Sequence, residues 1–305
     1  MRVAVLGLGL IGGSLVRRLA PQHDVRGYDV DVETRRQARD SGLRTADDLA
    51  SAVAGRELIV LAVPLDALST VVGQVASLLP PDAVLTDVGS VKQPVYAAVR
   101  GAGLAGRFVG GHPMAGTEFV GFAASDPGLY DGAAWVLCVE PDTVLSLWLR
   151  VARLLAGCGV RVVPATAAEH DDAVARISQL PHLLAAALAT VAGAGGPLAL
   201  TLAAGSFRDG TRVAGTPQGL PTAMVHSNGP AVDVAVAAAI ELLRGDRDAL
   251  LASGHDVRRG WPLPAGDPTA LDAGEAGLAD RLLRVGRLGG WLSIAEPDSL
   301  SVHLP

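Results

Sequence analysis

A glycine-rich turn near the amino terminus restricts the fold of this chain more than any other feature. An apolar run at residues 3–6, typical of a buried strand, is followed by the sequence GLGLIG at residues 7–12 and then by a helical run. Gly7 permits a tight turn, Gly9 lets the backbone approach a pyrophosphate, and Gly12 allows the helix to pack closely on the strand. Because the first N–H groups of such a helix can bind phosphates, the pattern predicts a dinucleotide-binding unit in an α/β fold.

The second predicted strand, residues 24–28, ends next to an acid. Asp29 stands at the distance from the glycines that is typical of the residue that binds the ribose 2′-hydroxyl. Its charge would repel a 2′-phosphate, so NAD is expected as cofactor, although Arg35 and Arg36 lie close enough along the chain to keep NADP open. The residues expected to bind the cofactor are Gly7, Gly9, Leu10, Ile11, Gly12, Asp29, Val63 and Pro64.

Two polar side chains follow further strand-like runs. Ser90 comes after the apolar run at residues 83–86, and His112 comes after the run at residues 107–109. The carboxyl ends of parallel strands meet at one edge of a sheet, which is where open α/β sheets bind ligands. A histidine there can exchange a proton near neutral pH, and a serine hydroxyl within reach can orient the histidine or its substrate. The pair therefore predicts acid–base chemistry.

Length and composition predict a chain with two domains. Half of the 305 residues are apolar, which is enough for a sizeable core. Strands are expected near residues 2–6, 24–28, 57–63, 83–87, 107–110, 134–139 and 160–164, and helical segments alternate with them. This alternation indicates a doubly wound, mostly parallel Rossmann-type sheet. From Thr166 onward the apolar spacing is helical, which predicts a second, all-α domain.

These patterns divide the chain into three parts. We expect a dinucleotide-binding domain at residues 1–165, a helical domain at residues 166–262, and a linker with a C-terminal extension at residues 263–305. Residues 264–277 are rich in Gly, Pro, Asp and Ala, as linkers are, and residues 278–288 fit one more helix.

Charge and cysteine content narrow the choice of partners and location. The formal net charge is −6 and no run of basic residues occurs, so neither a nucleic-acid nor an anionic-membrane partner is expected, and the ligands should be small molecules. Cys138 and Cys158 lie in apolar surroundings without metal-ligand spacing. No metal site is therefore expected, and two reduced thiols are typical of a cytoplasmic protein.

One uncharged stretch is long enough to suggest a membrane span. No charged residue occurs from Leu183 to Phe207. The stretch is rich in alanine, however, which contributes little to membrane insertion, and it would be broken into two helices by Gly193, Gly195, Gly196 and Pro197. A buried helical pair in a core or a subunit interface is the better interpretation.

The predicted helical domain carries polar residues of its own. Ser178 and His182 are four residues apart, so they should lie on the same side of one helix, and Arg212 follows a later helical run. Taken singly, His182 fits a hydrogen-bonded core histidine as well as a substrate ligand, and Arg212 fits a surface ion pair.

Five motifs in this order resemble the prephenate and arogenate dehydrogenases of tyrosine biosynthesis. They lie at residues 7–14, 87–92, 111–118, 177–182 and 207–212. The resemblance covers most of the chain up to about residue 245. It implies a dinucleotide domain joined to a helical dimerisation domain with the active site in the cleft between them, and a cytoplasmic homodimer. The implied reaction is the NAD-dependent oxidative decarboxylation of the dicarboxylate prephenate to 4-hydroxyphenylpyruvate, CO2 and NADH.

The same resemblance implies roles for individual residues. His112 would be the catalytic histidine, Ser90 its hydroxyl partner, and Arg212 the anchor of a substrate carboxylate. The other residues implied to line or border the pocket are Ser178, His182, Thr117 and Glu118. Gln179 departs from the pattern, because many relatives carry a histidine there. The region after about residue 260 matches nothing recognised, and no regulatory ACT-type domain is seen.

Three alternatives remain open. An arogenate dehydrogenase, or one for an amino-substituted analogue, would need an acid facing the substrate ammonium group, and Glu118 and Asp209 can instead pair with nearby arginines. A β-hydroxyacid dehydrogenase would resemble enzymes with a catalytic lysine in the helical domain, whereas the one lysine here, Lys92, precedes that domain. A non-catalytic dinucleotide-binding regulator would not need Ser90 and His112 together at strand ends.

Overall fold

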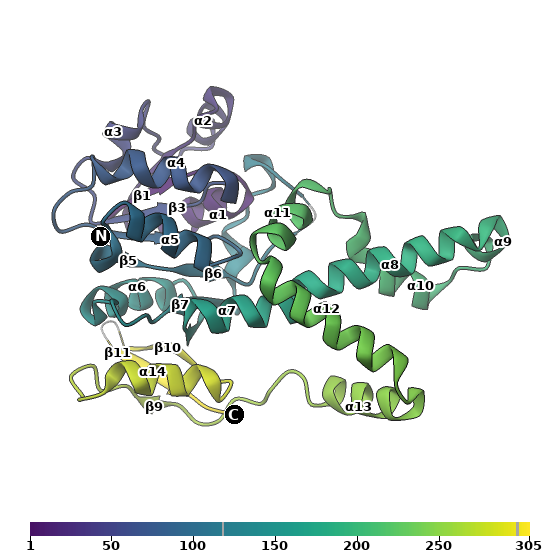
Figure 1. The fold of residues 1–305 in the computed structure, drawn as a ribbon. Coiled ribbons are helices and arrows are strands. Elements are labelled where there is room, and N and C mark those ends of the chain that lie inside the picture. Colours follow the sequence, from purple (N-terminus) through teal and green to yellow (C-terminus); the bar gives the residue numbers. More distant parts are fainter. Residues whose placement is uncertain (118, 297–298) are drawn as a thin grey trace. The chain divides into compact units, whose positions relative to one another are not determined.

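The computed structural model describes residues 1–117, 119–296 and 299–305. The chain divides into two compact units (Figure 1). The first unit contains Met1–His170 together with Leu263–Pro305, and the second contains Asp171–Pro262.

The first unit contains an entirely parallel sheet with the strand order β2-β1-β3-β4-β5. Its strands are β1 Arg2–Leu6, β2 Asp24–Tyr28, β3 Leu58–Leu61, β4 Val84–Asp87 and β5 Phe108–Val109. The helices that connect them are α1 Leu10–Leu19, α2 Val32–Asp40, α3 Leu49–Val53, α4 Leu65–Ala76, α5 Gln93–Gly101 and the short η1 Ala105–Arg107. The predicted doubly wound fold is thus confirmed, and β1 lies between β2 and β3 as parallel crossover connections allow.

A second, mixed sheet follows in the same unit, with the order β6-β7-β8-β10-β11-β9. Its strands are β6 Gly111–Pro113, β7 Ala134–Cys138, β8 Arg161–Ala165, β9 Thr269–Ala270, β10 Trp291–Glu296 and β11 Ser299–His303. The helices around it are η2 Phe122–Ala124, η3 Pro127–Tyr130, α6 Leu145–Gly157 and α14 Leu278–Arg287. The predicted strands near 134–139 and 160–164 therefore form, but in this second sheet, where β7 and β8 are parallel and the other pairs are antiparallel.

Helices cover both faces of the parallel sheet. Val3 and Val5 of β1 belong to one apolar cluster with residues of α1 and α6. Ala4 and Leu6 belong to another cluster with residues of α3, α4 and α5. Successive side chains of a strand point to opposite faces, so a strand that is apolar at every position is buried on both.

Residues 263–305 differ from the expected linker and extension. Their strands β9, β10 and β11 complete the second sheet, and Leu292 of β10 pairs with Val162 of β8. Leu278, Leu282 and Val285 form the buried face of α14. These apolar side chains belong to the same core cluster as residues of α1 and α6, and burial of their surface there holds the segment in the first unit.

The second unit is helical, as predicted. It continues from α7 Ala167–Val174, which begins in the first unit, through the π-helical turn η4 Ala175–Gln179 into α8 Leu180–Ala194. The later helices are α9 Gly196–Thr201, α10 Gly205–Thr211, η5 Arg212–Gly215, α11 Gly219–Ser227, α12 Gly229–Arg244 and α13 Arg247–Arg259. The predicted break between two helices occurs at Gly195 and Gly196, and Gly196 has a φ of +77° that favours glycine.

Much of this helical unit is apolar and exposed in the single chain. The helical stretch Ala167–Ala194 has the length and hydropathy of a membrane span, and 11% of its most apolar window is buried. Apolar helices that pack inside proteins pass the same test, so this is weak evidence for a span. Within α8, Leu184, Leu188 and Val191 are exposed. Two interpretations were expected for this apolar stretch, a buried core or a subunit interface. Most of its described residues are not buried in the core of the same chain, so a subunit interface is the interpretation that is left.

Candidate active site

The glycine-rich loop has the geometry of a phosphate cradle. Gly7 has a φ of +99°, and a Cβ atom on it would lie 2.2 Å from the Ala62 carbonyl oxygen. A Cβ atom on Gly12 would lie 1.9 Å from the Gly7 carbonyl oxygen. A Cβ atom on Gly9 would have no neighbouring atom within 4 Å. Gly9 directly precedes α1, whose first turn has no side-chain cap. Open space in front of free helix N–H groups fits a dinucleotide pyrophosphate.

Asp29 supports this loop from the end of β2. Its Oδ2 accepts a hydrogen bond from the Leu8 N–H at 2.8 Å, and its Oδ1 accepts one from the Asp31 N–H at 2.9 Å. Each carboxylate oxygen keeps a lone pair for a further donor such as a ribose hydroxyl.

The two arginines that could bind a 2′-phosphate have local partners. Arg35 donates to the carbonyl oxygens of Asp29 at 2.6 Å and Val30 at 3.2 Å. Arg36 forms ion pairs with Glu33 and Asp40, both at 2.6 Å. These contacts compete with any phosphate for the guanidinium groups.

The remaining predicted cofactor residues lie at the same end of the sheet. Leu10 and Ile11 form the first turn of α1, and the Ile11 carbonyl accepts a hydrogen bond from the Tyr130 hydroxyl. Val63 and Pro64 follow β3, and Pro64 is the residue that precedes α4. Because β3 is the neighbour of β1, both segments begin at adjacent strand ends.

A buried ion pair at the end of β4 holds the segment that carries His112. Asp87 and Lys92 are both 0% exposed, and the Lys92 ammonium pairs with Asp87 Oδ2. Asp87 Oδ1 accepts from the Gly111 N–H at 2.9 Å, while Lys92 donates to the Gly111 carbonyl at 2.7 Å. The pair therefore grips Gly111 through both of its backbone polar groups, one residue before His112. Sequence reasoning gave neither residue a role, although the spacing DVGSVK places an acid and the single lysine around Ser90.

His112 itself is bonded to another histidine. On β6, its Nδ1 lies 2.8 Å from Nε2 of His170, a buried residue of α7, and the ring planes meet at 77°. The pKa of His112 lies well below its usual value. Burial is the largest cause, and the charges of His170 and Lys92 lower it further. The imidazole is therefore uncharged at neutral pH, as a proton acceptor must be.

The predicted contact between Ser90 and His112 is not seen. Ser90 lies half-buried in the loop after β4, and its hydroxyl makes no hydrogen bond with any residue that the structure describes. His170, which takes the place beside His112, was visible in sequence only as part of the polar run EHDD at residues 169–172.

In the helical unit, the His182 side chain contacts the backbone of Ser178, four residues earlier along the helix. Nδ1 of His182 lies 2.8 Å from the Ser178 carbonyl oxygen. Because a carbonyl oxygen can only accept, the His182 proton lies on Nδ1 and the Nε2 lone pair is free when the ring is neutral. Arg212 is the first residue of η5, is exposed, and makes no ion pair within the part of the chain that the structure describes.

Gln179, the departure from the family pattern, has a structural role. It is 1% exposed, and its Oε1 accepts from the Asn228 amide at 2.8 Å. The same amide nitrogen donates to the Asp171 carbonyl at 2.8 Å. Gln179 thus links two helical segments of its own unit.

Thr117 and Glu118 are the two residues predicted to border the pocket. Thr117 is exposed, and its hydroxyl accepts from the Phe119 N–H at 3.2 Å. Glu118 lies outside the described residues.

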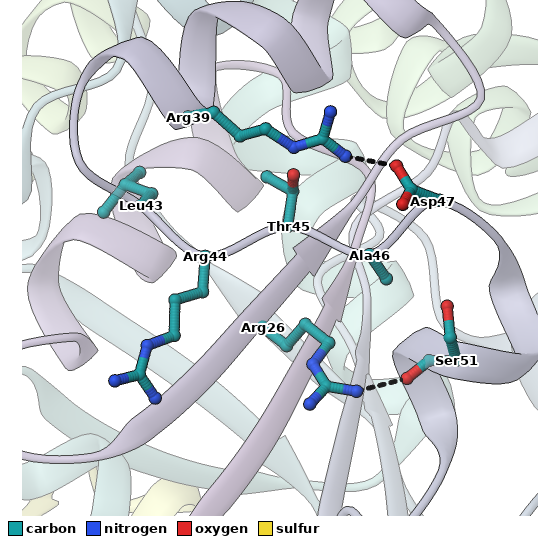
Figure 2. Close-up of a pocket in the computed structure, with 8 residues that line it drawn as sticks. All are labelled: Arg26, Arg39, Leu43, Arg44, Thr45, Ala46, Asp47 and Ser51. Atoms are coloured by element: carbon teal, nitrogen blue, oxygen red, sulfur yellow. Dashed lines mark hydrogen bonds and ion pairs between the residues drawn. The ribbon is translucent and has the colours of Figure 1, made fainter.

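A cavity of about 520 Å³ lies apart from these residues, beside β2 (Figure 2). Three arginines line it, but Arg26 donates to the Ser51 carbonyl and Arg39 pairs with Asp47, each at 2.5 Å. Its lining includes none of the predicted cofactor or catalytic residues. We therefore do not assign the active site to it.

Two family models match this chain. The nucleotide-binding domain of prephenate dehydrogenase matches residues 12–164, and the dimerization domain of prephenate dehydrogenase matches residues 166–243.

Curated relatives agree with these models. A prephenate dehydrogenase of Lactococcus lactis is 31% identical over 237 residues, which is 74% of this chain and 65% of the relative. A cyclohexadienyl dehydrogenase of Zymomonas mobilis is 32% identical over 239 residues, which is 75% of this chain and 82% of the relative. The chain thus spans slightly less than two thirds of the L. lactis protein.

Solved structures show the same fold. A candidate prephenate dehydrogenase from Corynebacterium glutamicum has a TM-score of 0.88 at 37% identity, covering 94% of this chain and 97% of that one. Synechocystis arogenate dehydrogenase has a TM-score of 0.71 at 30% identity, covering 86% and 94%. Prephenate dehydrogenase of Aquifex aeolicus, solved with hydroxyphenyl propionate and NAD⁺, has a TM-score of 0.75 at 25% identity, covering 86% and 94%. The chain therefore belongs to the prephenate dehydrogenase family, and its residues 12–164 match the nucleotide-binding domain of that family.

Proposed function

We propose that this enzyme is an NAD-dependent prephenate dehydrogenase, which converts prephenate to 4-hydroxyphenylpyruvate, CO2 and NADH in tyrosine biosynthesis. The observation that carries the proposal is the position of His112, which directly follows Gly111, the residue whose backbone is held by the buried Asp87–Lys92 pair at the end of β4. Strand β4 is separated from β1 and its glycine loop by β3 alone, a lateral distance of about 10 Å. Because the pair at the end of β4 holds Gly111, the residue before His112, we expect the substrate of His112 to meet a dinucleotide that extends from the glycine loop toward β4.

His112 is proposed to take the proton of the substrate 4-hydroxyl on Nε2. When bound, NAD would accept the hydride from the carbon that carries this hydroxyl. As the proton and hydride leave, the carbinol carbon becomes a carbonyl. The bond to the ring carboxylate then breaks, its electron pair stays in the ring, and CO2 departs. The resulting phenolate regains its proton from His112, so the base is restored. A positioned base of this kind contributes about 10²–10⁴-fold to the rate.

Arg212 is proposed to anchor a carboxylate of the substrate. Its guanidinium offers a fork of donors that matches a carboxylate, and it is exposed and unpaired among the described residues. Ser90 keeps its hydroxyl available for the substrate, and Ser178, His182, Thr117 and Glu118 are proposed to line the pocket. Replacing Arg212 with Ala should lower kcat/KM for prephenate at least about 30-fold, because a desolvated carboxylate would lose its partner.

Prephenate is preferred over arogenate on the basis of charge. Arogenate carries an ammonium group, which an uncommitted acid would have to face. Asp209 lies 3.4 Å from Arg208 in an exposed pair, and Glu118 lies outside the described residues. The likeness to an arogenate dehydrogenase at 30% identity keeps arogenate as the second candidate.

Steady-state formation of NADH by the purified enzyme tests the choice. We expect a higher kcat/KM for prephenate than for arogenate. A higher value for arogenate that is reversed by Glu118→Gln or Asp209→Asn would refute the assignment, and no turnover of either substrate would refute the proposed function itself.

We also propose a homodimer formed through the helical unit, NAD in preference to NADP, and a cytoplasmic location. The exposed apolar side chains of α8 and α12, among them Val191 and Leu242, support a dimer because water would otherwise contact them. The local partners of Arg35 and Arg36 support NAD. Cys138 and Cys158 are buried and form no disulfide among the described residues, which suits a reducing compartment.

A further inference from the structure

The hydrogen bond between His112 and His170 allows two arrangements of protons. Nδ1 of His112 lies 2.8 Å from Nε2 of His170. A hydrogen bond between two imidazole nitrogens needs a proton on one and a lone pair on the other. One ring therefore donates, and the identity of the donor determines which nitrogen of His112 carries its proton.

The two arrangements have opposite chemical consequences. If His112 donates from Nδ1, its Nε2 holds a lone pair and can accept a proton from the substrate. If His170 donates instead, a neutral His112 carries its proton on Nε2 and has no lone pair left for a substrate. Action of His112 as a base therefore requires His170 to be the acceptor. The imidazolium that forms also donates from Nδ1, so His170 can keep the same role before and after the proton transfer.

The position of His170 is fixed by contacts at the start of α7. His170 is 2% exposed. Thr166 and Glu169 form a reciprocal cap, in which each side chain accepts from the other's backbone N–H at 3.2 and 2.9 Å. Glu169 also pairs with Arg287 of α14 at 2.5 Å. The first turn of α7 is therefore attached to the first unit, which also contains His112.

We propose that His170 is a positioning residue that holds His112 as its Nδ1–H tautomer, so that Nε2 is the atom that accepts the substrate proton. This inference rests on the proposed catalytic role of His112. It gives His170 the task of orienting His112 and leaves the Ser90 hydroxyl for the substrate.

The tautomer can be measured without turnover. Heteronuclear NMR of the labelled, NAD-bound enzyme reports which ring nitrogen of each of the seven histidines carries a proton, and His112→Asn identifies the His112 signals. We expect His112 to carry its proton on Nδ1 in the wild-type enzyme and to shift toward the Nε2–H form in His170→Phe. A wild-type His112 with its proton on Nε2 would overturn the inference, even if the enzyme oxidises prephenate.

Kinetics supply the second test. We expect His170→Phe to lower kcat on the order of 10–100-fold, while KM for prephenate and Kd for NAD change less than about twofold. His170→Gln should recover most of that loss, because its amide oxygen can accept from Nδ1–H. Exposed His255 of α13 provides the matched control, since His255→Phe should leave kcat unchanged.

Thermal unfolding distinguishes positioning from folding. If His170→Phe does not fold, His170→Gln still carries the test: it should retain the Nδ1–H tautomer of His112 and a near-wild-type kcat. Unchanged kcat in a folded His170→Phe, or loss of kcat in His170→Gln equal to that in His170→Phe, would show that acceptance from Nδ1 is not what His170 provides.

Discussion

Replacing the single lysine, Lys92, with Met should destabilise the first unit and slow the reaction together. The substitution keeps the length of the buried side chain but removes its ion pair with Asp87 and its 2.7 Å hydrogen bond to the Gly111 carbonyl. Asp87 would keep its bonds from the N–H groups of Gly89 and Gly111 but lose its cation. Removing one partner of a buried ion pair costs about 3–5 kcal/mol.

A loss of that size should be plain in thermal unfolding followed by circular dichroism. At roughly 2–4 °C per kcal/mol, Tm should fall by about 6–20 °C. The kcat should fall about 10–100-fold, because β6 would lose one of the two contacts that hold Gly111 beside His112 and small misplacements of a catalytic group are costly. Asp87→Asn combined with Lys92→Met should recover part of the Tm, since no unpaired charge would remain buried.

A surface ion pair provides the matched control. Arg100 pairs with Asp142 at 3.1 Å, but its side chain is 45% exposed, so Arg100→Met should cost at most about 1 kcal/mol. If Lys92→Met destabilises the protein no more than Arg100→Met does, the buried pair does not contribute the expected stability to the first unit.

Three further predictions follow from the cofactor and proton-transfer residues. His112→Asn should lower kcat at least about 10²-fold with little change in Kd for NAD, whereas a variant that keeps its rate and loses NAD affinity would contradict the assigned role. Because burial, His170 and Lys92 lower the pKa of His112, kcat/KM should stay level as the pH falls through 6.5 and decline only below it. An acidic decline of kcat/KM that begins at or above pH 6.5 would contradict this expectation. The lowered pKa also means that His112 is protonated at a higher pH in the unfolded chain than in the folded one, so its contribution to stability is lost as the pH falls below 6.5. Asp29→Ser should raise the use of NADP relative to NAD by removing repulsion of the 2′-phosphate, and equal wild-type turnover with both cofactors would show that Arg35 or Arg36 controls this pocket instead.

The parts of the molecule that were predictable are those whose cause is local. The glycine loop could be predicted because Gly7 and Gly12 each leave no room for a Cβ atom, a constraint that the residue type itself expresses. The break between α8 and α9 was likewise visible as glycines and a proline in an apolar run. Parallel strands buried on both faces are apolar at every position, so the doubly wound sheet was also legible.

The second sheet was not predictable in the same way. Its β8 and β10 come from segments more than a hundred residues apart, and the residues near 264–277 have the composition of a linker. An amphipathic helix such as α14 packs wherever it meets a complementary apolar surface. The composition of the segment does not show whether that surface belongs to the same chain.

Sequence by itself therefore determined the family, the cofactor loop and the identity of His112 as the candidate base, because motif spacing and residue type carry that information. Only the tertiary structure decided how His112 is held. Its partner His170 lies 58 residues away, and the Asp87–Lys92 pair reaches Gly111 across 24 and 19 residues. A hydrogen bond depends on atoms meeting within about 3 Å. Folding brings those atoms together, and no local pattern in the chain encodes that meeting.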